Sequence, residues 1–406
     1  MNKLEKLILE EYKRTIGLGD FQLPLLFDTP VHIGKNLIKK LDEQRQYIDM
    51  FFKIIVGIGK KALHNEEEIL VKLLFSESIA GMTKEYHMNL PDCCWTIPIL
   101  YRTDQSVSGK IYEIQSPGSG WGDIPLLVYI FKQAGYIISD SYCKFADRYI
   151  ENIITITGKN EPNIYHMTDA ASAPVGMKYL LAITSEKLKY WGINKNVIMD
   201  KVDYVTAHSA AALITSNYFN EYLKLAVEGK VIFGIPPNLI FDQKSIYLLP
   251  FYRLTSDLFS DEIRTLFPFT TLIENDGFFD KNGKFISIKE FANRSKKQRL
   301  YYLKYGGPNL CKNWGSRGVH RLDGSDCEKR LNEANNLSKN GEVWLLQEDV
   351  SKEDINETSD EIRAIGEHIK LSAFNGICGQ LGIRIMARSH FKVHGQSDTK
   401  IGLAID

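Results

Sequence analysis

The chain has 406 residues and carries 50 basic and 50 acidic side chains, so its formal net charge is zero. Its length predicts about two or three domains. The balanced charge argues against a generic polyanion binder, since such proteins are usually basic overall, and an aromatic share of 11% argues against disorder.

Neither a membrane span nor a secretory signal is predicted. Residues 1–13 are polar and charged, and no apolar run approaches the roughly 18 residues that a bilayer requires. The six cysteines form no Cys-x-x-Cys pair, which disfavours a zinc site. We therefore expect a reduced, cytoplasmic protein.

The first 92 residues are predicted to be mainly helical. Apolar residues recur at helical spacing from Leu37 to Ile55 and again from Glu66 to Phe75. The pattern changes at Trp95, where two runs rich in β-branched and aromatic residues, TIPILYRTD and GKIYEIQ, flank a turn at 106–109. That arrangement predicts a β-hairpin.

The rest of the chain has two different patterns. Strand signals at 136–139, 163–167, 204–205 and 230–234 alternate with helix signals at 126–134, 173–191 and 217–227. This alternation predicts an α/β layer with parallel strands. Predicted strands at 300–305, 343–347, 382–387 and 399–405 then favour a mostly antiparallel α+β unit. We divide the chain into a helical region (1–92), a hairpin with an α/β domain (93–238) and a C-terminal domain (239–406).

Four polar residues of the hairpin can share one face. Arg102 and Asp104 lie two apart on the first arm, and Glu113 and Gln115 lie two apart on the second, so each pair points to one side of its strand. Carboxylate and amide oxygens are ligands that Mg²⁺ prefers, and an arginine beside them suits an anion. The alternative is a solvated hairpin face with a cross-strand ion pair.

Two glycine-rich segments and two lysines are further candidates for binding an anion. The segment GSGWG at 118–122 would let backbone amides approach a phosphate closely. Lys304 ends a predicted strand and precedes a second glycine-rich segment that contains Arg317, although an ordinary surface turn is the alternative. Asp242 is expected to cap a helical run over 245–252, with Lys244 in its first turn.

Taken in order, these segments resemble the ATP-grasp ligases of the glutathionylspermidine synthase type and the related circularly permuted ATP-grasp proteins. The similar segments are YRTD with YEIQSP, FGIPPNLIFDQKSIYLLP, YYLKYGG with NWGSRGV, VWLLQED, and KVHGQSDTKIGLAID. The resemblance covers roughly residues 95–406. It implies an ATP-grasp-like nucleotide-binding domain over 239–406, preceded by an α/β domain, with ATP and Mg²⁺ as cofactors.

The resemblance also implies roles for single residues. Asp104, Glu113 and Gln115 would hold Mg²⁺, and Arg102 would stabilise the transferring phosphoryl group. The residues implied to bind ATP are Lys244, Lys304, Gly315, Ser316, Arg317, Gly318, Gln347 and Glu348. The sequence departs from the family pattern twice, because Gln115 replaces an Asn and the loop GSRGV lacks the family's acidic residue.

The reaction implied by the resemblance is the ligation of a carboxylate to an amine through an acyl phosphate. The substrates would be small molecules such as an amino acid, a small peptide or a polyamine. Gln115 and the altered loop motivate a first alternative, an ATP-binding phosphotransferase or a regulatory module without ligase activity. Seven Lys and Arg residues within 284–304 motivate a second, a non-enzymatic protein that binds nucleic acid or a protein partner.

Overall fold

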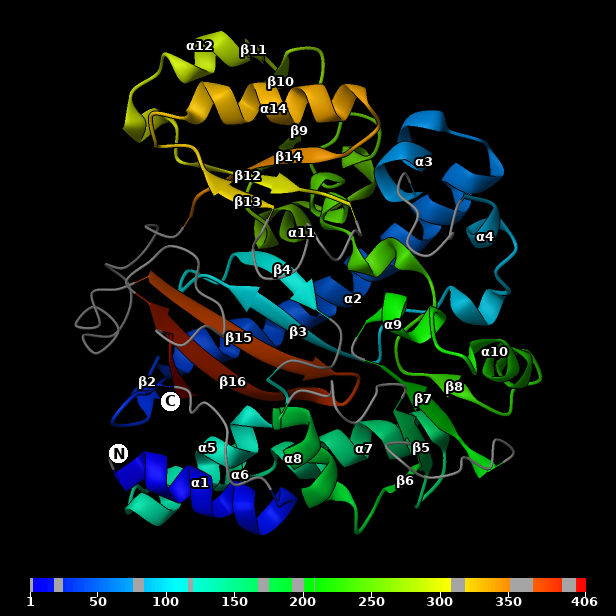
Figure 1. The fold of residues 1–406 in the computed structure, drawn as a ribbon, viewed down its shortest axis with the longest axis vertical. Helices are drawn as coiled ribbons and strands as arrows, with labels where there is room; N and C mark the ends of the chain where they lie inside the picture. Colours follow the sequence, from blue (N-terminus) through cyan, green and yellow to red (C-terminus); the bar gives the residue numbers. More distant parts are fainter. Residues whose placement is uncertain are drawn as a thin grey trace.

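The computed structural model describes residues 3–17, 25–75, 84–115, 120–166, 175–191, 201–207, 209–307, 318–350, 368–388 and 399–406. Within these ranges, helices surround a central mixed sheet, a parallel sheet and an antiparallel sheet (Figure 1). None of the described helices is both long enough and apolar enough to cross a membrane.

The central sheet joins strands from distant parts of the chain. These are β1 (Leu25–Leu26), β2 (Val31–His32), β3 (Leu100–Gln105), β4 (Ile111–Gln115), β15 (His368–Gly376), β16 (Gly379–Arg388) and β17 (Lys400–Ile405). Their order is β1-β17-β16-β15-β3-β4, and β2 also pairs with β17. The predicted hairpin is confirmed as β3 and β4, which are antiparallel. The two-residue strands β1 and β2 were not predicted, because so short a segment has no periodicity.

The helical prediction for the N-terminal region is confirmed. Its helices are α1 (Lys3–Ile16), α2 (Lys35–His64), α3 (Glu68–Phe75) and α4 (Lys84–Met88), followed by the 3₁₀ turn η1 (Asp92–Cys94). The long helix α2 lies along one face of the central sheet (Figure 1). There, Leu41 belongs to one apolar cluster with Leu371, Ala373, Ile383 and Ile385. Since side chains alternate along a strand, the residues between these apolar ones point to the opposite face.

The predicted parallel layer is confirmed as a sheet with the strand order β6-β5-β7-β8. Its strands are β5 (Asn163–His166), β6 (Lys189–Trp191), β7 (Tyr204–Thr206) and β8 (Ile232–Phe233). The helices of this region are α5 (Asp123–Ala134), α6 (Asp140–Cys143), α7 (Phe145–Thr157), α8 (Val175–Thr184), α9 (Ala210–Ile214) and α10 (Phe219–Val227).

Two predictions in this layer were wrong. Residues 136–139 form no strand, because α5 ends at Gly135 with a positive φ of 101° and the Tyr136 amide donates back to the Phe131 carbonyl. The helix predicted over 173–191 ends at Thr184, and β6 begins at Lys189, whose amide donates to the Pro162 carbonyl.

The third sheet is antiparallel, as predicted for the C-terminal region. It contains β13-β12-β14-β9 in that order. Its strands are β9 (Thr270–Leu272), β12 (Tyr301–Tyr305), β13 (Val319–Arg321) and β14 (Trp344–Glu348). Around it lie α11 (Asp261–Leu266), the hairpin of β10 (Gly277–Phe279) and β11 (Phe285–Ser287), α12 (Ile288–Ala292), η6 (Lys296–Gln298) and α14 (Cys327–Lys339).

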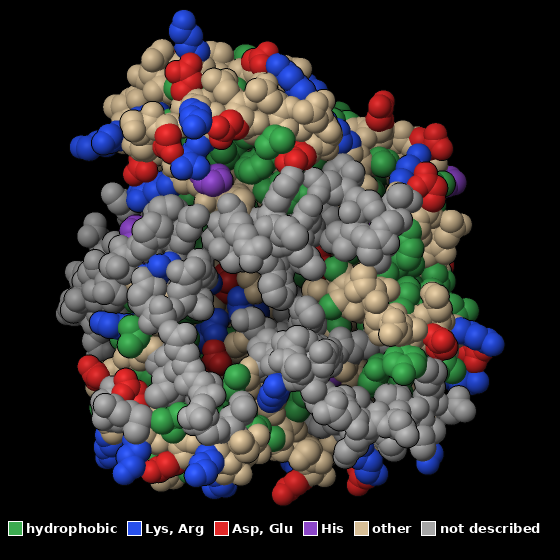
Figure 2. Space-filling model, in the orientation of Figure 1, with side chains coloured by type: hydrophobic (Ala, Val, Ile, Leu, Met, Phe, Trp, Pro, Cys, Tyr) green, Lys and Arg blue, Asp and Glu red, His purple; other side chains and the backbone are tan. Residues whose placement is uncertain are grey.

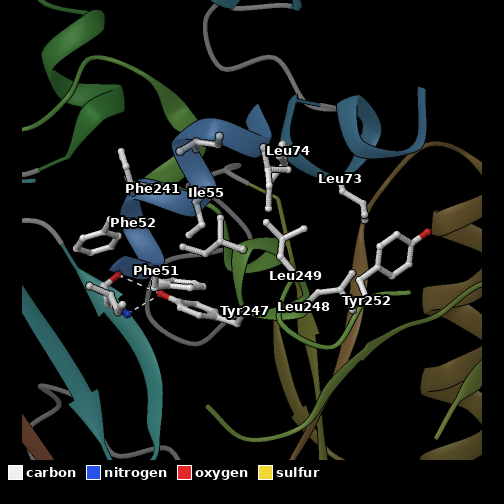
Figure 3. Packing of buried hydrophobic residues seen from close by; sticks show 14 of the residues in the cluster. Phe51, Phe52, Ile55, Leu73, Leu74, Phe241, Tyr247, Leu248, Leu249 and Tyr252 are labelled. Carbon is white, nitrogen blue, oxygen red and sulfur yellow. Dashed lines mark hydrogen bonds between the residues drawn. The ribbon is translucent and has the colours of Figure 1, made fainter. Parts of the chain in front are cut away.

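A large apolar core connects α2 to the segment that carries Lys244. This segment consists of the 3₁₀ turns η3 (Leu239–Asp242) and η4 (Lys244–Leu248), with η5 (Ser256–Leu258) further on. Phe51 and Phe52 of α2 pack in this core with Phe241 and Tyr247 (Figure 3). The Tyr247 hydroxyl accepts a hydrogen bond from the Ile114 amide and donates one to the Ile114 carbonyl, at 3.3 Å. The core therefore fixes η4 against β4.

Candidate active site

The register of the central sheet places four polar residues in one row. Glu113 lies opposite Asp104, Asp104 opposite Ser372, and Ser372 opposite Arg384. Directly paired residues of antiparallel strands share a face, and this face is the one turned away from α2. Arg102 and Gln115 form the next row, since they are also paired. The four hairpin residues predicted to share a face therefore do so.

Asp104 is the most strongly paired carboxylate of this face. Its Oδ1 lies 3.0 Å from Arg102 Nε and 2.8 Å from Ser372 Oγ, and its Oδ2 accepts a hydrogen bond from Lys370 Nζ at 2.9 Å. Burial opposes ionisation, but the charges of Arg102, Lys370 and Arg384 outweigh it and hold the pKa of Asp104 well below its usual range.

Gln115 is held against Arg102 rather than left open. Its Oε1 accepts a hydrogen bond from Arg102, and its Nε2 lies 3.5 Å from Asp104 Oδ2. The amide oxygen predicted to bind a metal is therefore engaged by a guanidinium.

Glu113 pairs with one of the two predicted nucleotide lysines, Lys244, and is within electrostatic range of the other, Lys304. Lys244 Nζ of η4 lies 3.5 Å from Glu113 Oε1. Burial tends to raise the pKa of Glu113, but Lys244 and Lys304 lower it by more. Burial lowers the pKa of Lys304 to about 8, and the charge of Lys244 adds to this effect. One third of the Glu113 side chain is exposed, compared with 3% of the Asp104 side chain.

Gln347 and Glu348, two of the residues implied to bind ATP, lie on β14. Gln347 is buried; its Oε1 accepts a hydrogen bond from Lys304, and its Nε2 donates to Thr270 Oγ1 at 3.2 Å. Glu348 follows it, and its amide donates to the Phe269 carbonyl. In the second glycine-rich segment, the Gly318 carbonyl accepts from the Tyr305 amide, whereas Gly315, Ser316 and Arg317 lie outside the described residues.

Asp242 does not cap the helical run that follows it, contrary to the prediction. Residues 244–248 form the 3₁₀ turn η4, and no side chain caps its start. The Asp242 carboxylate instead accepts a hydrogen bond from the Ala211 amide at 3.1 Å, at the beginning of α9. The helix that Asp242 caps is therefore distant in sequence, so the local pattern could not reveal it.

The first glycine-rich segment packs against an arginine. Of this segment, residues 120–122 are described. Gly120 has a φ of +82°, and a Cβ built there would lie 2.2 Å from the guanidinium nitrogen NH1 of Arg384. The same guanidinium forms an ion pair with Asp123, the first residue of α5. A glycine is therefore needed here to admit the arginine.

Sequence reasoning missed Lys370, Ser372, Arg384 and Asp123. Lys370 lies on β15, which pairs with β3 of the hairpin, and Arg384 lies on β16, which pairs with β15; the local sequence reveals neither pairing. The one local signal is a charged residue inside a mainly apolar strand run, as in GIRIMA.

The site carries an excess of positive charge. Five cationic residues, Arg102, Lys244, Lys304, Lys370 and Arg384, gather with the three acidic residues Asp104, Glu113 and Asp123. Figure 2 shows basic and acidic side chains at the bottom of a hollow in this face of the molecule. Because uncompensated buried charge is unfavourable, this arrangement suits an anion.

The donor set fits Mg²⁺ only in part. Glu113 offers a carboxylate on a partly exposed side chain, which suits an ion that is usually held by one or two carboxylates together with substrate phosphates. Asp104 does not fit, because cations and a hydroxyl occupy both of its oxygens. Nowhere in the described ranges do three or more His, Cys, Asp or Glu side chains gather in a way that could hold a metal ion.

Comparisons with known proteins support the fold. No protein-family model and no curated protein matches the chain. Among solved structures, it is similar to a glutathione synthetase-like effector (GSS30) from Globodera pallida in its apo form, with a TM-score of 0.50 and 10% identity over 99% of this chain and 96% of the other. The chain therefore has a mixed α/β fold similar to a glutathione synthetase-like structure, which confirms the predicted mixture of α and β layers.

The basic run 284–304 does not form one continuous surface. Lys304 lies in the site described above, and Arg299 is buried with its guanidinium donating to the Gly324 carbonyl at 3.1 Å. Arg294 forms an ion pair with Glu290 at 3.0 Å. The charges of this run are therefore divided among different structural roles.

Proposed function

We propose that this protein is an ATP-dependent carboxylate–amine ligase of the ATP-grasp type. The observation that carries the proposal is that Lys244, from η4, lies 3.5 Å from the partly exposed Glu113, and that Lys304, from β12, is close enough for its charge to act on the same carboxylate. The similarity to a glutathione synthetase-like effector supports the same class at the level of the fold.

In the proposed reaction, a carboxylate oxygen of the acid attacks the γ-phosphorus of ATP. The bond to the β,γ-bridging oxygen breaks, ADP leaves, and an acyl phosphate forms. The amine nitrogen then attacks the acyl carbon, inorganic phosphate leaves, and the nitrogen loses a proton to give the amide. The protein's contribution to such a transfer is mainly positioning and charge stabilisation.

The residues have distinct proposed roles. Lys244 and Lys304 neutralise phosphate oxygens, and Lys304 is held in place by its hydrogen bond to Gln347. Arg102, which is buried and fixed by Asp104, stabilises charge on the transferring phosphoryl group. Glu113 would hold Mg²⁺, which when bound neutralises charge on the phosphates.

The first test is binding of MgATP, measured by calorimetry, to the wild type and to the variants Lys244→Met and Lys304→Met. Each variant should weaken binding about tenfold or more, because a charged hydrogen bond to phosphate is worth about 1.5–3 kcal/mol. Lys289→Met is a matched control, since Lys289 is an exposed lysine outside the site. Absence of MgATP binding to the wild type would contradict the proposal.

The second test separates a ligase from other ATP-binding proteins. The wild type is screened with amino acids, small peptides and polyamines, and the products are identified by mass spectrometry. A ligase releases ADP and phosphate only when an acid and an amine are both present, and an amide appears. ADP with a stable phosphorylated product would identify a phosphotransferase, and binding without turnover would favour a regulatory module.

A further inference from the structure

We propose that Asp104 is a positioning residue rather than a metal ligand, and that Lys370, which it holds, binds the terminal phosphoryl group of ATP. This inference rests on the proposed function, because it assigns a further residue to the same nucleotide site.

The first step of the argument is the occupancy of the Asp104 carboxylate. An ionised carboxylate can accept about four hydrogen bonds. Ser372 Oγ donates to Oδ1 at 2.8 Å, Lys370 Nζ and a terminal Arg102 nitrogen donate to Oδ2 at 2.9 and 3.0 Å, and Arg102 Nε makes an ion-pair contact with Oδ1 at 3.0 Å. A metal ion could reach Asp104 only by displacing a cation from a side chain that is 3% exposed.

The second step is the difference between Asp104 and its cross-strand partner. Glu113 lies directly opposite Asp104, yet its nearest cation, Lys244, is 3.5 Å away and a third of its side chain is exposed. One carboxylate of the pair can therefore accept a metal ion with phosphates, whereas the other already has its counter-charges. The metal-binding role thus falls to Glu113 on β4, and the positioning role to Asp104 on β3.

The third step is the position of Lys370. Its strand, β15, lies two strands away from β4, which carries Glu113 at the edge of the sheet. Neighbouring strands are about 4.8 Å apart, so the two strands are separated by about 10 Å. An extended triphosphate has a comparable length. A nucleotide whose inner phosphates meet Lys244 and Lys304 would thus direct its terminal phosphate toward Lys370.

The fourth step concerns access. The Lys370 side chain is 14% exposed, more than the Asp104 side chain beneath it. Arg102 and Arg384 lie close enough for their charges to act on Lys370. The ammonium group is therefore fixed by one carboxylate among several like charges, an arrangement that favours an incoming oxyanion.

The main test compares MgATP with MgADP by calorimetry. Lys370→Met should weaken binding of MgATP at least tenfold and change binding of MgADP by less than twofold, and Lys370→Arg should recover part of the loss. Lys400→Met is the matched control, since Lys400 is an exposed lysine of the same sheet. Equal weakening for both nucleotides, or for neither, would overturn the assignment of Lys370.

The metal role is tested by repeating the MgATP titration over a series of free Mg²⁺ concentrations. Glu113→Gln should raise the Mg²⁺ concentration required for half-maximal binding, whereas Asp104→Asn should leave it unchanged although the nucleotide binds more weakly. A shift in Asp104→Asn as large as that in Glu113→Gln would show that Asp104 is a metal ligand.

A last measurement needs no nucleotide and separates this inference from the proposed function. Urea unfolding is compared for Asp104→Asn, Lys370→Met and the double variant. If Asp104 positions Lys370, the double variant should be less destabilised than the sum of the single variants, because neither charge is left alone. Strict additivity would contradict the positioning role, whereas a wild type that binds no MgATP would contradict only the proposed function and the phosphate role.

Discussion

Two carboxylates, Asp104 in the central sheet and Asp242 of η3 beside the start of α9, have pKa values shifted in opposite directions. Asp104 is surrounded by Arg102, Lys370 and Arg384, and its pKa lies well below the usual range. Burial raises the pKa of Asp242 to about 6, although the amides of Ala210 and Ala211 oppose this rise. A carboxylate that accepts hydrogen bonds from amides at a helix start thus has a raised pKa, whereas one that faces three cations has a lowered pKa.

Removal of the Asp104 carboxylate should have the largest effect on stability. Asp104→Ala should lower the free energy of unfolding by about 3–5 kcal/mol, because it leaves buried cations without their counter-charge. Urea unfolding measures this change. Asp147→Ala is the control, since Asp147 pairs with Lys187 at 3.4 Å with both side chains more than half exposed, and it should change stability by less than about 1 kcal/mol. If both variants lost the same stability, the buried cations around Asp104 would not depend on its charge.

The pH dependence of stability should separate the two carboxylates. The stabilisation from Asp104 is present at neutral pH and is lost only as pH falls through its low folded-state pKa. Asp242 acts in the opposite direction: its folded-state pKa is raised to about 6, so its contribution falls as pH rises from about 4 to about 6, by about 2 kcal/mol. Asp242→Asn should remove this part of the pH profile in urea unfolding, and an unchanged profile would contradict the assignment.

A side chain added next to Arg384 should displace one of the cations that lower the pKa of Asp104. Gly120→Ala should destabilise the protein by about 2 kcal/mol, because it adds a Cβ against the guanidinium at a positive φ. Gly135→Ala is the matched control: its φ is also positive, at +101°, but its Cβ would meet nothing within 4 Å. Thermal unfolding should show the greater loss for Gly120→Ala, and equal losses would indicate backbone strain alone.

The smallest expected effect concerns the link between η4 and β4. Tyr247→Phe removes the hydrogen bonds to Ile114 and should lower stability by about 1 kcal/mol. It should also weaken MgATP binding, since Lys244 follows the position of η4. Tyr222→Phe is the control, because the buried Tyr222 hydroxyl has no hydrogen-bond partner within the described residues. If the two variants unfold alike, the link has little energetic weight.

The sequence could predict those parts of the site that are local. The hairpin, with Arg102, Asp104, Glu113 and Gln115 on one face, follows from strand periodicity and one turn. The sequence predicts the two strands that carry Lys304 and Gln347. It does not predict that these strands pair. Where a role depended on a distant partner, as for Asp242 and α9, local patterns gave the wrong neighbour.

Lys370 and Arg384 could not be predicted, because their roles arise from the register of β15 with β3 and with β16. Asp104 and Ser372 are opposite in the sheet but 268 residues apart in the chain. A shift of that register by one residue would turn Lys370 and Ser372 toward α2. The sequence shows that β15 carries a charged residue, Lys370, but not that Asp104 on β3 is its partner.

The pairing of β3 with β15 also has a consequence for how the chain acquires its structure. During synthesis the hairpin emerges long before β15, so Asp104 meets Lys370 and Ser372 only after most of the chain has been made. Contacts between such distant residues slow folding, since a large loop must close first. Until then, the open edge of β3 is available to other chains. The amides that join β3 to β15 should therefore become protected from hydrogen exchange later during refolding than those of the local β3–β4 hairpin.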